Sequence, residues 1–146
     1  MNQRTTQRPK IGGVHHFSPT VTDIEASVDW YQRVFGLERV PVPFPHHGSE
    51  ESGYAILLTD PNSSLAIGLH HHDANTGEPC DESRTGLDHL ALSVSDRSEL
   101  AAWADWLDVL GIHHSSITDM DEPFAYSVLV FRDPDNIQLE LFAMNQ

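Results

Sequence analysis

The sequence predicts an α+β fold made of two tandem β-α-β-β-β modules, because its second half repeats motifs of the first half in the same order. Each half has a glycine-led run containing a histidine, an apolar stretch that ends at a glycine, and an Asp-Pro turn. The paired segments are 13–17 and 86–90, 35–37 and 110–112, and 60–62 and 133–135. Tandem copies of one unit place equivalent residues around a shared cleft.

The first module is expected to span residues 12–70, after a disordered lead-in over residues 1–10. Asp23 is a suitable N-cap, and apolar residues at helical spacing predict a helix from Ile24 that ends at Gly36. Alternating or apolar runs predict its strands, and a proline-rich stretch predicts a loop. The expected strands are 13–21, 38–42, 53–59 and 64–70, and the expected loop is 41–53.

The second module is expected to span residues 86–143, after a polar and acidic linker over residues 71–85. Its predicted helix carries leucines and tryptophans at helical spacing and ends at Gly111. The expected strands are 87–94, 112–118, 125–132 and 137–142. Both modules together form a single domain of 146 residues.

The composition excludes several classes of partner. With 8 basic and 22 acidic residues the net charge is −14, which disfavours nucleic acids and anionic membranes. No apolar stretch approaches the roughly 20 residues of a membrane span. We see no secretory signal at the start, and a single cysteine, Cys80, fits a reducing cytoplasm. We therefore expect a cytoplasmic protein whose partner is a small molecule.

The strand pattern separates candidate functional residues from the core. Successive side chains of a strand point to opposite faces of the sheet. His16, His89 and Glu140 each fall on the less apolar face of their predicted strand. The repeat therefore predicts that two histidines and one carboxylate share the cleft.

Four segments resemble signatures of the vicinal oxygen chelate superfamily, also called the glyoxalase/bleomycin-resistance/dioxygenase superfamily. They are residues 14–23, 30–37, 88–94 and 131–141, and the resemblance covers residues 12–143. It implies paired modules that form an incomplete curved barrel around a divalent metal ion. It also implies that metal ligands lie on the first and last strands of each module.

Carried onto this chain, the resemblance implies His16, His89 and Glu140 as metal ligands. Gly68 falls at the remaining ligand position and has no donor side chain, so it is expected to leave a corner open to water or substrate. This set suits iron(II), manganese, nickel, cobalt or zinc. Tyr126 is a candidate catalytic residue, because its phenol could hydrogen-bond a substrate oxygen.

The resemblance implies a small metalloenzyme that acts on an oxygenated metabolite or natural product. Dioxygenase-like ring cleavage, thiol transfer to an epoxide and a glyoxalase-type lyase reaction all stay open, and three ligands favour the first two. The alternative is a metal-free protein that sequesters a cationic drug, as bleomycin-resistance proteins do, and the charge of −14 fits it. We expect a homodimer, because an open curved sheet leaves edges that must be covered.

The remaining histidines are interpreted as structural. The run His70-His71-His72 is predicted to be a solvated cluster at a strand end that binds metal only adventitiously, although His70 shares the face of Gly68. His46 and His47 are interpreted as loop residues. The role of the histidine run is left open.

Overall fold

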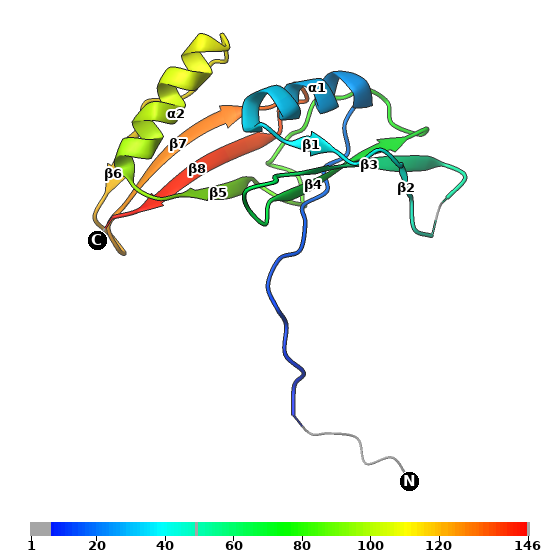
Figure 1. Ribbon diagram of the computed structural model, residues 1–146, viewed down its shortest axis with the longest axis horizontal. Helices are drawn as coiled ribbons and strands as arrows, with labels where there is room; N and C mark the ends of the chain where they lie inside the picture. Colours follow the sequence, from blue (N-terminus) through cyan, green and yellow to red (C-terminus); the bar gives the residue numbers. More distant parts are fainter. Residues whose placement is uncertain (1–6, 49, 146) are drawn as a thin grey trace.

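The structure is a computed structural model that describes residues 7–48 and 50–145, and these residues form two helices and two β-sheets (Figure 1). Part of the predicted disordered lead-in, residues 1–6, lies outside the described residues. The two sheets do not close into a barrel (Figure 1). The predicted α+β class and the incomplete barrel are confirmed.

The first sheet is built around β3, which pairs antiparallel with three other strands. The segment before α1 runs parallel to β4 through isolated bridges from Phe17 to Ile67 and from Thr20 to His70. The strands are β1 Glu38–Arg39, β2 Phe44–Pro45, β3 Gly53–Thr59 and β4 Ala66–His72.

The second sheet repeats this connectivity in the order β5-β8-β7-β6. β5 runs parallel to β8, whereas β7 pairs antiparallel with both β8 and β6. The strands are β5 Leu90–Val94, β6 Thr118–Met120, β7 Tyr126–Arg132 and β8 Gln138–Met144. In each half a first strand therefore runs parallel to the last strand, as a βαβββ unit requires.

The first helix begins and ends at the residues that the sequence indicates, and the second helix ends at Val109, two residues before the predicted stop at Gly111. In α1 (Ile24–Phe35) the Asp23 carboxylate accepts a hydrogen bond from the Ala26 N–H at 3.0 Å. Gly36 ends this helix with φ 66°, a left-handed conformation that glycine adopts without a steric penalty. Asp96 caps α2 (Arg97–Val109) in the same way as Asp23 caps α1. Neither helix is long and apolar enough to cross a membrane, and no other helix occurs among the described residues.

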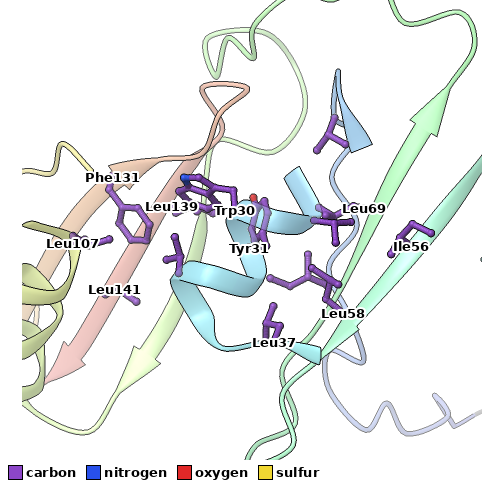
Figure 2. Close-up of a cluster of buried hydrophobic side chains, with 14 of the residues drawn as sticks. Trp30, Tyr31, Leu37, Ile56, Leu58, Leu69, Leu107, Phe131, Leu139 and Leu141 are labelled. Atoms are coloured by element: carbon purple, nitrogen blue, oxygen red, sulfur yellow. The ribbon is translucent and has the colours of Figure 1, made fainter. Parts of the chain in front are cut away.

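One apolar core joins the two sheets through α1. Figure 2 shows Trp30 and Tyr31 of α1 between Phe131 and Leu139 of the second sheet and Leu58 of the first. Tyr31 is fully buried, and Trp30 packs against Phe131 with ring centroids 6.2 Å apart. Because α1 occupies the space between the sheets, their outer faces point away from this core.

Four predicted strands are clearly shorter than expected. The strand expected at 87–94 begins only at Leu90. The segment 13–21 forms only bridges among the described residues, because Pro19 has no N–H to donate to a ladder. The strand expected at 38–42 ends at Arg39, just before Pro41, and a short strand, β2, forms inside the predicted loop 41–53. The strand expected at 112–118 is reduced to a bridge at His114 and the later strand β6.

Candidate functional site

His89 and Glu140 face each other on adjacent parallel strands of the second sheet. His89 directly precedes β5, and Glu140 lies in β8 opposite Ala91. His89 Nε2 is 4.0 Å from Glu140 Oε2, and the Glu140 side chain is only 17% exposed. An imidazole nitrogen and a carboxylate oxygen therefore converge on this sheet face.

The other ring nitrogen of His89 is held by a neighbouring carboxylate. Asp88 Oδ1 lies 2.7 Å from His89 Nδ1, which favours the tautomer that carries its proton on Nδ1. That tautomer leaves a free lone pair on Nε2, the nitrogen that faces Glu140. Metal-binding histidines are commonly oriented by a carboxylate in this way. The His89–Glu140 pair therefore has the chemistry of two ligands of a divalent ion.

Three aromatic rings lie beyond this pair, and we call them the aromatic wall. Phe142 follows Glu140 by two residues in β8, so the two side chains share a face. The rings of Tyr126 and Phe142 stack with centroids 4.9 Å apart and an interplanar angle of 14°. Phe124, which is 48% exposed, completes the wall against Tyr126 with ring centroids 5.6 Å apart. The wall offers flat apolar surface to a planar ligand.

Tyr126, the candidate catalytic residue, is the middle ring of the aromatic wall, between Phe142 and Phe124. The register of β7 and β8 places Val130 opposite Glu140 and Tyr126 opposite Met144. At 3.2–3.4 Å per residue, Tyr126 is about 13 Å along β7 from Val130. The ring contributes to the wall, and a hydrogen bond from its phenol to a substrate oxygen stays a prediction.

His16 lies beside β4 in the first half of the chain. Its Nδ1 is 2.9 Å from His15 Nδ1. Both rings line a groove of about 650 Å³ between the sheets, which residues 90–94 of β5 also line. The ligand atoms of His16, His89 and Glu140 do not all lie within 4.8 Å of one another in the single chain. The structure therefore brings two of the three predicted ligands together and places the third away from them, at a groove whose lining includes neither His89 nor Glu140.

Gly68 occupies the position in the first sheet that matches Glu140 in the second. Gly68 lies in β4 opposite Leu57, as Glu140 lies in β8 opposite Val130. A Cβ added to Gly68 would be 2.8 Å from Ser18 Oγ. The Ser18 hydroxyl therefore lies directly beside Gly68, at the position that the resemblance implied would be open to water or substrate.

A second group of ligand atoms lies on the first sheet, where His46 meets His70 and His72. Burial is the main cause that lowers the pKa of His70 and of His72, and the neighbouring His46 lowers both further. His71 is on the opposite face of β4, and its Nε2 lies 2.9 Å from Asp73 Oδ1. The sequence indicated that His70 faces inward, but it gave no sign that a residue of the predicted loop 41–53 would join it.

Comparison with known families shows to which superfamily the chain belongs. The model of the Glyoxalase/Bleomycin resistance protein/Dioxygenase superfamily matches residues 13–141. The chain belongs to this superfamily. Among solved structures, the glyoxylase/bleomycin resistance protein/dioxygenase domain from Frankia sp. EAN1pec is 30% identical, with a TM-score of 0.79. That match covers 94% of this chain and 95% of the Frankia chain.

Two further members of the superfamily are more distant. A mutant of the fosfomycin resistance protein from Listeria monocytogenes, complexed with Mn(II) and 1S,2S-dihydroxypropylphosphonic acid, has a TM-score of 0.61. It is 17% identical over 90% of this chain and 92% of its own, a likeness that shows the fold alone. MhqA of Bacillus subtilis (strain 168), named as a ring-cleaving dioxygenase, is 22% identical over 134 residues, or 92% of this chain. The match spans only 41% of MhqA.

As a glyoxalase/dioxygenase superfamily member, this chain divides its candidate ligands between its two sheets. The His89–Glu140 pair supplies one nitrogen and one oxygen, and the groove between the sheets is lined by His15 and His16.

Proposed function

We propose that the protein is a metal-dependent enzyme of the glyoxalase/dioxygenase superfamily, with a divalent ion bound by His16, His89 and Glu140. The observation that carries this proposal is the His89–Glu140 pair, in which Asp88 orients the histidine and leaves its Nε2 4.0 Å from the carboxylate. Imidazole and carboxylate ligands suit iron(II), manganese, nickel, cobalt or zinc. Three protein ligands leave coordination positions for water or substrate.

The chemistry that a bound ion supplies is polarisation of two adjacent substrate oxygens, which lowers their pKa. Residues of the chain itself orient the ligands, balance the charge of the ion and shield the substrate from water. Asp88 keeps His89 in the tautomer that offers Nε2. Glu140, which is largely shielded from water, offsets part of the positive charge. The aromatic wall excludes water from one side of the bound substrate.

The aromatic wall supports a planar substrate, specifically an aromatic ring with two adjacent oxygens. Aromatic rings pack well against such surfaces in offset-stacked or edge-to-face geometry, and Phe142 lies two residues from Glu140 on the same face. The name of the relative MhqA, a ring-cleaving dioxygenase, points the same way. We therefore favour dioxygenase-like ring cleavage over thiol transfer and over a glyoxalase-type lyase reaction.

The site is completed, in this proposal, by a second copy of the chain. Among the described residues, β5 pairs only with β8, and the segment carrying His16 pairs only with β4. Each therefore has an unpaired edge, and both edges border the groove of about 650 Å³. Unpaired edges are templates for association. A homodimer would bring His16 of one copy to the His89–Glu140 pair of the other.

A cytoplasmic location is also part of the proposal. Its support is the single cysteine, Cys80, which is free and suits a reducing compartment.

Manganese(II) binding tests the proposed site. Protein without a His tag is stripped with a chelator and titrated with manganese(II), which prefers sites that contain carboxylate. Wild type should bind one equivalent per chain, and Glu140→Ala should weaken binding at least tenfold. Glu38→Ala removes an exposed strand carboxylate and should bind like wild type. Equal manganese affinity in wild type and Glu140→Ala would refute the proposed ligand set.

Mixing two inactive variants tests whether the site is shared between copies. His16→Ala and Glu140→Ala homodimers should each bind manganese weakly. If each site combines His16 of one copy with Glu140 of the other, a mixed dimer contains one intact site, and mixing should restore up to half of the binding. If both ligands come from one copy, mixing restores nothing, and the shared-site proposal is wrong.

The drug-sequestering alternative has one observation in its favour, the net charge of −14, which attracts cations. It makes a different prediction for the same preparations. Metal-stripped wild type and Glu140→Ala would bind a cationic antibiotic equally, and neither would bind manganese.

A further inference from the structure

We propose that His46, His70 and His72 form a second metal site, which takes a divalent transition ion such as zinc through three imidazole ligands. The three side chains offer ligand atoms that all lie within 4.8 Å of one another. All three are half-buried. Neither Glu140 nor His89 belongs to this site. His16 lines the pocket beside His70, so the two proposals are separated by testing them with different ions and different variants.

The pairing of the strands explains why these rings meet. β2 and β4 lie on either side of β3, so they are separated by about 9.6 Å, twice the spacing of neighbouring strands. His46 directly follows β2 and continues its register to face Gly53, and Gly53 is the partner of His72 in β4. The His46 and His72 rings therefore flank a glycine, and their centroids are 3.9 Å apart at an interplanar angle of 87°.

Small residues on β3, the central strand, allow the histidine rings from its two sides to come into contact. A Cβ on Gly53 would collide with the backbone carbonyl oxygen of His71, so the position requires glycine. The next row places Ala55 opposite His70. With only a hydrogen and a methyl group between them, side chains two strands apart can reach each other over the sheet.

The distances between the imidazole nitrogens suit a bound metal ion. His46 Nδ1 lies 3.0 Å from His70 Nδ1. Two nitrogens bound to one tetrahedral zinc at 2.0–2.1 Å are about 3.3 Å apart, so this pair is already near ligand spacing. In the absence of an ion, one of the two nitrogens must carry the proton that the pair shares. A bound ion would replace that proton, and small rotations of the side chains would bring a ring nitrogen of His72 into its coordination shell.

Three histidines leave a fourth tetrahedral position for a small molecule. His70 also lines a pocket of about 190 Å³ whose wall includes Phe44, His15, His16 and His47. That volume suits water or a small anion rather than the larger ligands of typical binding pockets. We infer that the pocket supplies the fourth ligand.

The same strand provides a matched control. His71 lies between His70 and His72, but it faces the opposite side of the sheet, next to Tyr54 and Asp73. If zinc were held merely by exposed histidines, His71→Ala would weaken binding as much as His72→Ala. If zinc is held by the cluster, only the inward-facing residues matter.

The experiment measures zinc(II) binding to chelator-stripped, tag-free protein by competition with a chromophoric chelator. All variants are made in the Glu140→Ala background, so the other proposed site is disabled. This background should bind one equivalent of zinc. Adding His46→Gln or His72→Ala should weaken binding at least tenfold, and adding His71→Ala should change it less than twofold. Cobalt(II) should give the visible absorption of a tetrahedral site in the background protein and lose it with His72→Ala.

Folding is checked separately by thermal unfolding in excess chelator, where all variants should melt within a few degrees of the background. Should His72→Ala fail to fold, His46→Gln, which alters a residue outside the regular strands, keeps the test intact. The proposal is overturned if the background protein binds no stoichiometric zinc, or if His71→Ala weakens binding as much as His72→Ala. Either result leaves the manganese experiment on Glu140 unaffected.

Discussion

The turns that begin at Asp60 and at Asp133 match in sequence but lie in different surroundings. Asp60 accepts hydrogen bonds within its own turn, from the Asn62 N–H at 2.9 Å and the Ser63 hydroxyl at 2.6 Å. Asp133 is 5% exposed and accepts a hydrogen bond at 2.8 Å from the hydroxyl of Tyr31, which lies in the other half of the chain. One copy of the motif closes a surface turn, and the other copy joins the two halves.

The reason for the difference is the position of α1. This helix lies between the sheets and brings Tyr31 to the turn at Asp133. The next carboxylate of that turn, Asp135, accepts hydrogen bonds from the Thr22 N–H at 3.1 Å and from the Thr22 hydroxyl at 2.5 Å. Duplication produced two similar turns, and the packing of a single helix gave one of them a role in the core.

The outer sheet faces have diverged as well. In the second sheet, Glu140 and Phe142 present a carboxylate and an aromatic ring. In the first sheet the matching row carries Gly68 under the Ser18 hydroxyl, and histidines gather further along. The same backbone plan therefore holds two different sets of ligand atoms.

Asp133→Ala should have the largest effect on stability. It leaves the buried Tyr31 hydroxyl and the N–H of Ile137 without their acceptor. A buried donor without a partner costs about 1–3 kcal/mol, so the free energy of unfolding should fall by about 2–4 kcal/mol. Denaturant unfolding followed by circular dichroism measures this change.

Asp60→Ala is the matched control, and it should lower the free energy of unfolding far less, because water can replace the hydrogen bonds of Asp60. Asp133→Asn should fall between the two, since its amide keeps one acceptor oxygen. Equal losses in the free energy of unfolding for Asp60→Ala and Asp133→Ala would show that the two turns contribute equally to stability.

Local signals in the sequence predicted most of the fold. The cap at Asp23 and the glycine at Gly36 bounded α1 correctly because both act through backbone groups a few residues away. The strand pattern likewise placed His89 and Glu140 on one face, since the alternation of side chains depends only on the strand itself. Where prolines interrupt a ladder, as at Pro19, the same pattern overestimated the strand length.

Contacts between distant segments could not be predicted in the same way. The arrangement of the two sheets depends on contacts such as that of Trp30 with Phe131, and no local pattern encodes that packing. The meeting of His46 with His72 depends on a short strand inside a proline-rich stretch and on the glycine between them. Both features become visible only when the strands are paired.

Gly53→Ala should have an intermediate effect on stability, and Gly68→Ala provides a comparison on the same face of the first sheet. The new Cβ would meet the backbone carbonyl of His71, which cannot move without disturbing β4. Overpacking of this kind costs about 1–3 kcal/mol. Gly68→Ala should cost less, because its Cβ would be 2.8 Å from the side chain of Ser18, which can rotate. Thermal unfolding of both variants in chelator tests this order, which would be wrong if Gly68→Ala were the less stable protein.

The smallest expected effect on stability concerns two arginine–carboxylate pairs, one in each half of the chain. Arg132 donates to both oxygens of Glu82 at 2.9 and 2.6 Å, and these hydrogen bonds lower the pKa of Glu82 from 4.5 to about 2. In the first half, Arg39 lowers the pKa of Glu25 in the same way, but the Glu25 side chain is 65% exposed whereas that of Glu82 is 28% exposed. Solvent should therefore screen the Glu25 pair more strongly.

The sign of the pH dependence follows from the direction of these shifts. A carboxyl whose pKa is lower in the folded state releases its proton more readily there, so the unfolded state binds more protons at acidic pH. The stability that Glu82 contributes is therefore complete above about pH 4.5 and is lost as the pH falls toward about 2. Glu82→Gln should flatten the fall of the free energy of unfolding across that window, and Glu25→Gln should flatten it less. Urea unfolding at closely spaced pH values measures both slopes, and a steeper loss in Glu82→Gln than in wild type would reverse the assigned role of Arg132.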